Sequence, residues 1–135
     1  MTPFTTVMII DDDADDRDML IEAVKEISPE IVMTEAENGF AGLEKLKTGL
    51  KKPDIIFLDL NMPKMNGKQF LKNIKSCENL SLIPVVIYTT SKQIEDKEET
   101  EKLGAAYFLS KPVSFDKLKE EIKKVFVKMG KLVKA

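Results

Sequence analysis

Polar residues that could bind a metal ion or a phosphoryl group stand directly after short apolar runs of the sequence. They are Asp11, Asp12 and Asp13 after Val7–Ile10, Asp59 after Ile55–Leu58, Thr89, Thr90 and Ser91 after Val85–Tyr88, and Ser110 and Lys111 after Tyr107–Leu109. Grouped carboxylates repel one another, and a hard divalent cation relieves this repulsion. Mg²⁺ prefers one or two carboxylates together with water and a phosphoryl oxygen. These residue types therefore predict a Mg²⁺ site wherever the fold brings them together.

Phosphoryl transfer to a carboxylate is the chemistry that such a set can perform. One aspartate can act as the nucleophile, because a carboxylate is ionised at neutral pH without an activating base. Lys111 would supply a point charge to one phosphoryl oxygen, and Thr89 would donate a hydrogen bond to another. The chain has no histidine, which excludes His-ligated zinc and hydrolysis by a Ser-His-Asp triad. The residues alone thus indicate a Mg²⁺-dependent aspartyl-phosphate site.

Each of these residues also has a purely structural explanation. The acidic residues before the first helix could cap it, and Asp13 and Asp15 are expected to do so. A single aspartate after a strand is usually a turn residue, and Thr89 or Lys111 alone would more often be a cap or a solvated side chain. Their joint placement after separate apolar runs favours one shared site.

The apolar runs and the segments between them predict a fivefold alternation of strand and helix. The expected strands are Val7–Ile10, Ile31–Met33, Ile55–Leu58, Val85–Tyr88 and Tyr107–Leu109. Helical spacing of apolar residues predicts five helices. The first ends before Pro29, the second runs from Asn38 to before Pro53, the third contains Phe70–Ile74, the fourth covers Gln93–Leu103, and the fifth follows Ser114. Continuous apolar runs are typical of parallel strands covered on both faces. The expected fold is α/β, a flavodoxin-like (βα)5 doubly wound parallel sheet with strand order 2-1-3-4-5.

This strand order makes the first and third strands neighbours, so that the residues after them meet at one edge of the sheet. At least two carboxylates, Asp59 and one or more of the aspartates after the first strand, are therefore expected to share a pocket. Lys111 follows the fifth strand at the same edge, and Asp12 and Lys111 are expected to meet across this pocket although they lie at opposite ends of the sequence.

Composition bounds the class of protein. The 135 residues, 43% hydrophobic and 33% charged, suit a single globular domain. No apolar run approaches the roughly 18 residues of a membrane span, and no signal peptide is recognisable. Cys77 is the only cysteine, which is typical of a reducing compartment, so a cytoplasmic location is expected. Six aspartates and one arginine lie within residues 1–18, whereas eight lysines and three acids lie within residues 111–135.

The sequence resembles the receiver domain of two-component response regulators, of the CheY-like, stand-alone type. The resemblance is carried by the segments Ile9–Asp13, Asp59–Gly67, Thr89–Thr90 and Lys111–Pro112. It covers essentially all of residues 1–135, so a single receiver domain without an output domain is expected.

The resemblance assigns roles to the acidic residues. It implies that Asp59 accepts a phosphoryl group from a phosphohistidine, and that Asp12 binds Mg²⁺ directly. Asp11 would contact the metal through water, and Asn61 would offer its backbone carbonyl to the metal. The metal set implied by the resemblance is therefore Asp11, Asp12, Asp59 and Asn61.

The resemblance also implies a switch. Thr89 and Lys111 would hold the phosphoryl group, and a cis peptide bond before Pro112 would aim the lysine into the pocket. Movement of Thr89 toward the phosphoryl group would let Phe108 turn inward and shift a two-state equilibrium. The sequence departs from the family at two places: Thr90 stands where many receivers have alanine, and Phe108 lacks the hydroxyl or ring nitrogen of tyrosine or histidine.

The expected partners are a sensor histidine kinase or a His-phosphotransfer protein, and a downstream target protein. The expected output surface consists of the fourth helix, the fifth strand and the fifth helix, which could also form a homodimer. No nucleic acid and no membrane are expected as partners, because the lysines of the last helix alternate with acids and no recognition motif follows. Either a chemotaxis-like output or a phosphorelay step fits the sequence.

Three other hypotheses remain open at this point. A dehalogenase-type phosphatase would need an aspartate two residues after the nucleophile, where the chain has Asn61. A flavodoxin-type cofactor binder would need a phosphate-binding loop after the first strand, where three aspartates would repel a phosphate. A degenerate receiver that only binds a partner would not need the complete residue set. The chain is thus expected to be a signalling phosphoacceptor rather than an enzyme that turns over a separate substrate.

Overall fold

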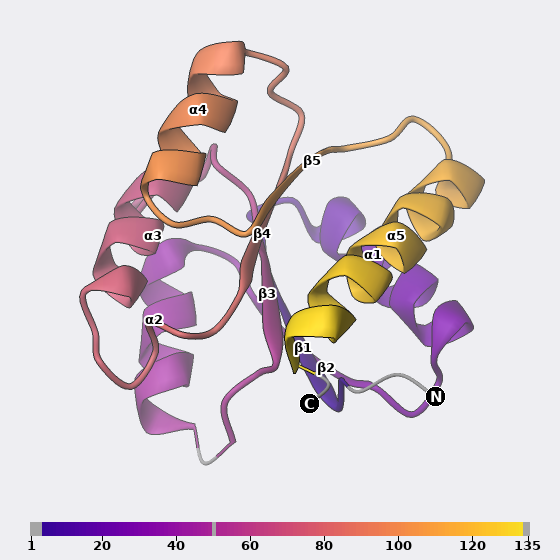
Figure 1. The fold of residues 1–135 in the computed structure, drawn as a ribbon, viewed down its shortest axis with the longest axis horizontal. Coiled ribbons are helices and arrows are strands. Elements are labelled where there is room, and N and C mark those ends of the chain that lie inside the picture. Colours follow the sequence, from indigo (N-terminus) through magenta and orange to yellow (C-terminus); the bar gives the residue numbers. More distant parts are fainter. Residues whose placement is uncertain (1–3, 50, 134–135) are drawn as a thin grey trace.

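The computed structural model describes residues 4–49 and 51–133, and strands and helices alternate along them (Figure 1). The strands are β1 (Thr6–Ile10), β2 (Val32–Ala36), β3 (Ile55–Leu58), β4 (Val85–Thr89) and β5 (Tyr107–Ser110). The helices are α1 (Ala14–Ile27), α2 (Gly39–Thr48), α3 (Gly67–Lys75), α4 (Ile94–Lys102) and α5 (Phe115–Val133). All strand pairs are parallel, in the order β2-β1-β3-β4-β5. The predicted fold class and strand order are confirmed.

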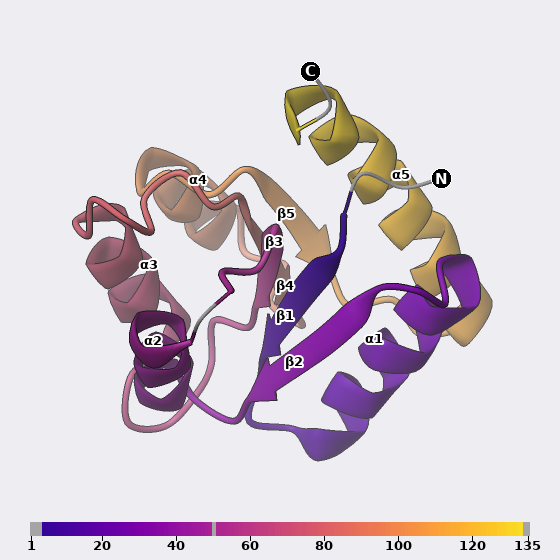
Figure 2. The same ribbon diagram turned by 90° about the horizontal axis from the view of Figure 1, so that it is seen from below.

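The sheet lies between two layers of helices. Helices α1 and α5 cover one face, and α2, α3 and α4 lie on the other side (Figures 1 and 2). Every residue of β1, β3 and β4 is buried, as expected for central strands between two helical layers. Two hydrophobic clusters result, one centred on Phe57 and Tyr88 under α1 and α5, the other on Ile10 and Phe70 under α2 and α3.

Strand β2 differs from its predicted bounds. The apolar pattern predicted a strand at Ile31–Met33, whereas the strand runs from Val32 to Ala36 and includes Thr34 and Glu35. β2 is an edge strand whose side chains are mostly accessible, so its pairing with β1 and not an apolar pattern defines its extent. Ile31 is buried but lies just before the strand.

The helix starts follow the capping side chains expected from the sequence. The Asp13 carboxylate accepts hydrogen bonds from the backbone N–H groups of Asp15 and Asp16, and the Asn38 side chain caps α2. The Ser114 hydroxyl accepts from the Lys117 N–H at the start of α5. Because of these caps, the helices start close to the ends of the preceding strands. The residues between each strand and its helix therefore stay at the same edge of the sheet.

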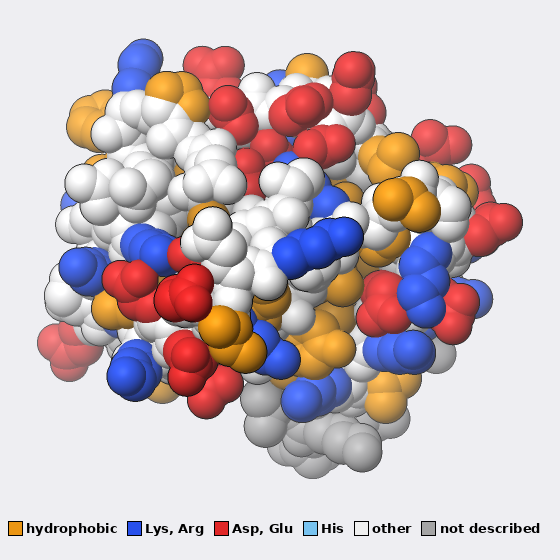
Figure 3. Space-filling model, turned by 90° about the horizontal axis from the view of Figure 1, so that it is seen from above, with side chains coloured by type: hydrophobic (Ala, Val, Ile, Leu, Met, Phe, Trp, Pro, Cys, Tyr) orange, Lys and Arg blue, Asp and Glu red, His pale blue; other side chains and the backbone are white. Residues whose placement is uncertain are grey.

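Helix α4 is the least embedded helix of the fold. Thr100 is its only buried residue, and Ile94 at its start is 62% exposed. Within the described residues, no helix is both long and apolar enough to cross a membrane. Acidic side chains gather at the top of the face shown in Figure 3, and several lysines lie near its lower edge.

Candidate functional site

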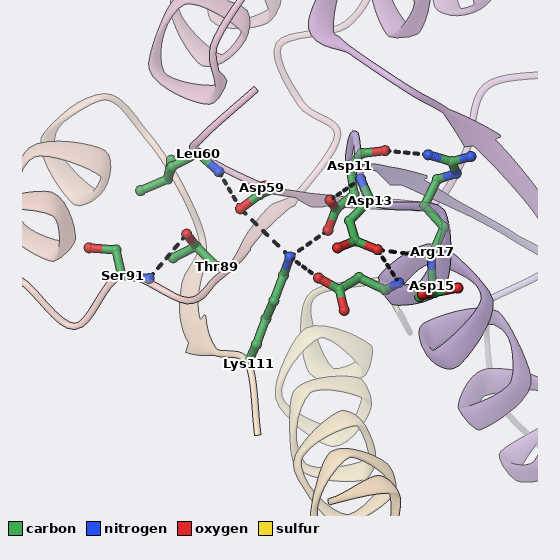
Figure 4. A network of polar contacts seen from close by, with 10 residues as sticks. Asp11, Asp13, Asp15, Arg17, Asp59, Leu60, Thr89, Ser91 and Lys111 are labelled. Atoms are coloured by element: carbon green, nitrogen blue, oxygen red, sulfur yellow. Dashed lines mark hydrogen bonds and ion pairs between the residues drawn. The ribbon is translucent and has the colours of Figure 1, made fainter. Parts of the chain in front are cut away.

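Three carboxylates gather at the carboxyl-terminal ends of β1 and β3. The register pairs Ile10 with Leu58, so the residues that follow them, Asp11 and Asp59, lie side by side (Figure 4). One carboxylate oxygen each of Asp11, Asp12 and Asp59 lies within 4.8 Å of the others. Asp11 and Asp59 are buried, whereas Asp12 is exposed. The structure therefore brings together the three carboxylates expected to share a pocket, with one open side at Asp12.

Lys111 reaches the same pocket from the end of β5. Its backbone N–H donates to the Thr89 carbonyl at 2.8 Å, and its Nζ lies 2.7 Å from Asp11 Oδ2 and 2.7 Å from Asp16 Oδ2. The distance from Nζ to Asp59 Oδ1 is 3.9 Å. Lys111 and the acidic start of the chain do meet, but its three ion pairs are with Asp11, Asp16 and Asp59 and not with Asp12.

The expectation of a cis peptide bond before Pro112 is wrong for this structure, because the described residues contain no cis peptide bond. The trans form is the more stable one for an X–Pro bond by about 0.5–1 kcal/mol. The Lys111 side chain nevertheless reaches the carboxylates. Its position follows from the backbone hydrogen bond to Thr89 and from the ion pairs with Asp11 and Asp16.

Burial dominates the electrostatics of the two buried acids. It raises the pKa of Asp59 from its usual 3.8 to about 6, while the charge of Lys111 lowers it and that of Asp11 raises it. Burial likewise raises the pKa of Asp11, against the opposing hydrogen bond from Lys111. For Lys111, burial favours the neutral amine, but the hydrogen bonds to Asp11 and Asp16 outweigh it and raise the pKa. The pocket thus concentrates negative charge that one ammonium group does not fully compensate.

We expect this charge to cost stability when no metal ion is bound. Folded Asp59 has a pKa of about 6, above its usual 3.8, so the folded state binds the proton more tightly than the unfolded chain. The resulting stabilisation is complete below about pH 4 and is lost as the pH rises through about 6. At neutral pH the ionised carboxylate then costs about 3 kcal/mol.

Urea unfolding in the presence of a chelator tests this expectation. Near neutral pH, Asp59→Asn should be more stable than the wild type by about 2–3 kcal/mol, and the difference should vanish near pH 4. Comparing the two proteins at each pH cancels the titration of those acids that do not interact with Asp59. An equal or lower stability of Asp59→Asn near neutral pH would contradict the raised pKa.

The donor set fits a hard divalent cation. Three carboxylate oxygens lie within 4.8 Å of one another, and oxygen ligands are those that Mg²⁺ prefers. The exposed carboxylate of Asp12 leaves space for water and for a phosphoryl group. Asn61 is exposed and lines a cavity of about 460 Å³ with Leu60, Met62, Asn66, Lys68 and Asp96. Its role as a carbonyl ligand stays a prediction.

Thr89 lies at the end of β4 and is fully buried. A hydrogen bond from its hydroxyl is among the causes that lower the pKa of Asp59. Its Oγ1 also accepts from the Ser91 N–H at 3.3 Å. Thr89 is thus next to Asp59, as the sequence predicts, and its hydroxyl is connected to the loop that precedes α4.

A network that the sequence did not indicate continues from this loop. The Ser91 hydroxyl donates to Asp96 at 2.5 Å, and Lys68 of α3 binds Asp96 at 2.7 Å and Glu99 at 2.8 Å. These ion pairs join α3 to the first turns of α4. No spacing rule relates Lys68 to residues about 30 positions later, so the sequence carries no signal for them.

Phe108 lies in β5 opposite Ile87 of β4. It is partly buried, packs against the cluster under α2 and α3, and borders a cavity of about 390 Å³ between α4, β5 and α5 that Tyr107, Thr100 and Lys128 also line. Its position beside free space is compatible with a side chain that turns, and the switch itself stays a prediction.

Sequence reasoning missed two residues of the site, Asp16 and Arg17. Asp16 lies in the first turn of α1 and binds Lys111. The Arg17 guanidinium donates to the Asp11 carbonyl at 2.7 Å and to Glu35 at 2.8 Å, so it ties α1 to the ends of β1 and β2. A signal for Asp16 exists: it is three residues after the N-cap Asp13, a position whose side chain commonly points back to the helix start.

Comparison with known proteins gives concordant matches. A model of the response regulator receiver domain matches residues 7–123. The chain is 31% identical to the protein PilH of Pseudomonas aeruginosa over 119 residues, 88% of this chain and 95% of PilH. It is 32% identical to the sensor histidine kinase CheAY of Helicobacter pylori over 118 residues, which are 87% of this chain but only 14% of CheAY.

Solved structures match over nearly the whole chain. The phosphorylated cyanobacterial phytochrome response regulator RcpA superposes with a TM-score of 0.83 at 25% identity, covering 90% of both chains. The Mn²⁺-bound form of the response regulator Rcp1 superposes with a TM-score of 0.81 at 25% identity, covering 90% of this chain and 91% of Rcp1. These two proteins are similar to this chain over nine tenths of its length.

Proposed function

The chain belongs to the response regulator receiver domain family, and from this we propose that Asp59 accepts a phosphoryl group from a phosphorylated histidine in a Mg²⁺-dependent reaction. Receiver domains are signalling phosphoacceptors rather than classical enzymes. The proposal rests on five polar side chains that lie together at one edge of the sheet. They are Asp11, Asp12, Asp59, Thr89 and Lys111. The family match also argues against a dehalogenase-type phosphatase and a flavodoxin-type cofactor binder.

In the proposed step, an Asp59 carboxylate oxygen attacks the phosphorus atom, an O–P bond forms, and the P–N bond to the imidazole of the donor breaks. Asp59 Oδ1 accepts a hydrogen bond from the Leu60 N–H at 2.9 Å, which orients the carboxylate. The Lys111 ammonium, 3.9 Å from that oxygen, is near enough to move onto a phosphoryl oxygen. The Thr89 hydroxyl would donate to another.

Asp11, Asp12 and Asp59 would hold the Mg²⁺ ion, with the carbonyl of Asn61 as a further ligand. The bound ion would neutralise the carboxylates and the charge that develops on the phosphoryl oxygens. The proposal agrees with the Mn²⁺-bound form of the similar regulator Rcp1 and with the phosphorylated form of RcpA.

The proposed output is a change at the surface formed by α4, β5 and α5. Phosphorylation adds charge and acceptor oxygens at Asp59. Movement of Thr89 toward these oxygens would alter the contact of Thr89 with Ser91 and would vacate space for Phe108. Ser91 and Phe108 both lie next to the surface formed by α4, β5 and α5. The surface would then bind a downstream target or a second copy of the chain.

The proposed phosphoryl donors are a sensor histidine kinase or a His-phosphotransfer protein. The alignment with PilH spans nearly all of both chains, which supports the proposal that residues 1–135 act as a stand-alone receiver domain. We further propose a cytoplasmic location, with which the single cysteine Cys77 agrees.

Phosphorylation by a small-molecule donor tests the proposed function without a known kinase. The purified protein is incubated with acetyl phosphate, with Mg²⁺ or with a chelator, and its intact mass is measured. We expect one phosphoryl group per chain with Mg²⁺ and none with the chelator. Beryllofluoride, which mimics the phosphoryl group, should change the NMR spectrum of the protein only when Mg²⁺ is present. Absence of any Mg²⁺-dependent change in both measurements would refute the proposal.

A further inference from the structure

The Lys111 ammonium is held on the α1 side of the pocket. Its Nζ lies 2.7 Å from both Asp11 Oδ2 and Asp16 Oδ2, but 3.9 Å from Asp59 Oδ1. The last distance is too long for a hydrogen bond. Figure 4 shows Lys111 extending toward the carboxylates, with dashed lines to several of them. In this arrangement Asp59 forms an ion pair with the ammonium but no hydrogen bond, whereas Asp11 and Asp16 each form both.

Asp16 differs from the other carboxylates of the pocket in its position. It belongs to the first turn of α1, where its backbone N–H is held by the N-cap Asp13 at 3.2 Å. It is not part of the carboxylate cluster that could hold a metal ion. Its side chain is 31% exposed, whereas that of Asp11 is fully buried. Its contact with Lys111 is therefore the one that water can replace at the lower cost when the ammonium moves.

From these contacts, and resting on the proposed function, we propose that Asp16 is a positioning residue that retains Lys111 on the α1 side while Asp59 is unphosphorylated. The retained lysine leaves the Asp59 oxygen free to attack. After transfer, a phosphoryl oxygen competes with Asp16 for the ammonium. Asp16 thereby limits how strongly the pocket holds the phosphoryl group.

Removal of the Asp16 charge should strengthen binding of a phosphoryl mimic. In Asp16→Asn the ammonium keeps only Asp11 as a strong partner and can move toward Asp59. We expect the affinity for beryllofluoride, at saturating Mg²⁺, to rise about fivefold, which is typical of losing one competing, partly exposed charged contact. Asp16→Glu, which retains the carboxylate, should restore affinity close to that of the wild type.

Asp15→Asn is the matched control. Asp15 is the adjacent residue of the same helix turn and is exposed, and it makes no ion pair among the described residues. The substitution changes the net charge equally, so it measures the general electrostatic effect of one lost aspartate. We expect it to change the beryllofluoride affinity by less than about twofold.

A double-mutant cycle then shows whether the effect passes through the lysine. Lys111→Met will weaken beryllofluoride binding by itself, but Asp16→Asn should have no further effect in the Lys111→Met background. If Asp16 acts only through its charge at a distance, Asp16→Asn will raise the affinity in both backgrounds. That result would overturn the inference.

The position of the lysine can also be followed without any metal ion. Lys111 Nζ lies 5.3 Å from the ring centroid of Tyr88, so the ring resonances of Tyr88 in the metal-free protein report on the ammonium. We expect Asp16→Asn to shift these resonances, and Asp15→Asn and Asp16→Glu to leave them close to those of the wild type. Unchanged resonances in Asp16→Asn would contradict the retention of Lys111 by Asp16.

The outcomes separate this inference from the proposed function. If the wild type does not bind beryllofluoride with Mg²⁺, the proposed function itself fails. If the wild type binds it and Asp16→Asn behaves like Asp15→Asn, only the role of Asp16 is refuted. A fivefold gain that requires Lys111, together with the shift at Tyr88, supports the inference.

Discussion

Asp59→Asn is expected to abolish phosphoryl acceptance from acetyl phosphate. The amide is neutral and a poor nucleophile. Among the residues that the structure describes, Asp59 is the only carboxylate that lies at the end of β3 beside both Asp11 and Lys111. Loss of the nucleophile should lower the rate of phosphorylation by about 10³-fold or more. Intact mass measured over time with Mg²⁺ provides the rate for the variant and for the wild type.

Asp13→Asn is a suitable control for this loss. It removes one negative charge near the pocket, and asparagine caps a helix about as well as aspartate. Asp13 is exposed and caps α1. We therefore expect Asp13→Asn to accept a phosphoryl group at a rate within about threefold of the wild type. If Asp59→Asn were still phosphorylated at the wild-type rate, a different residue would have to be the acceptor.

Gly67→Ala is expected to have the largest effect on stability. A Cβ atom at Gly67 would lie 2.4 Å from the Asp59 carbonyl oxygen and 2.7 Å from the Leu60 Cα. Both are backbone atoms of the segment that follows β3, so the clash cannot be relieved by rotating a side chain. We expect a loss of about 3 kcal/mol in the free energy of unfolding, and a Tm lower by roughly 10 °C.

Gly67→Ala should also disturb the carboxylate pocket, because relief of the clash moves the segment that carries Asp59. Gly42→Ala in α2 is the matched control. There a Cβ atom would lie 2.7 Å from Ile10 Cδ1, the end of a side chain that can shift, and alanine favours a helix interior by about 1 kcal/mol. Calorimetry should show a change in Tm for Gly42→Ala that is less than half that for Gly67→Ala; equal losses would refute the backbone clash as the cause.

The sequence alone predicted the fold class, the strand order and four of the five strands to within about one residue at each end. For β1, β3 and β4 the reason is that buried parallel strands are continuous apolar runs. The exception was β2, whose exposed edge position removes that signal. Topology also predicted that Asp59 and at least one of the aspartates after the first strand would converge, since residues after adjacent parallel strands must lie at the same edge of the sheet. The resemblance to receiver domains specified Asp11 and Asp12.

Tertiary structure decided which charges pair. Strand order places Lys111 at the correct edge, but it does not determine that the ammonium binds Asp11 and Asp16 at 2.7 Å and not Asp12. Likewise, Arg17 contacts the Asp11 carbonyl and Lys68 joins α3 to α4. Long charged side chains have many rotamers, and their partners depend on distances and burial that local sequence patterns do not encode. Apolar periodicity and strand ends are local properties that survive in the sequence, whereas the pairing of flexible charges exists only after the helices have packed on the sheet.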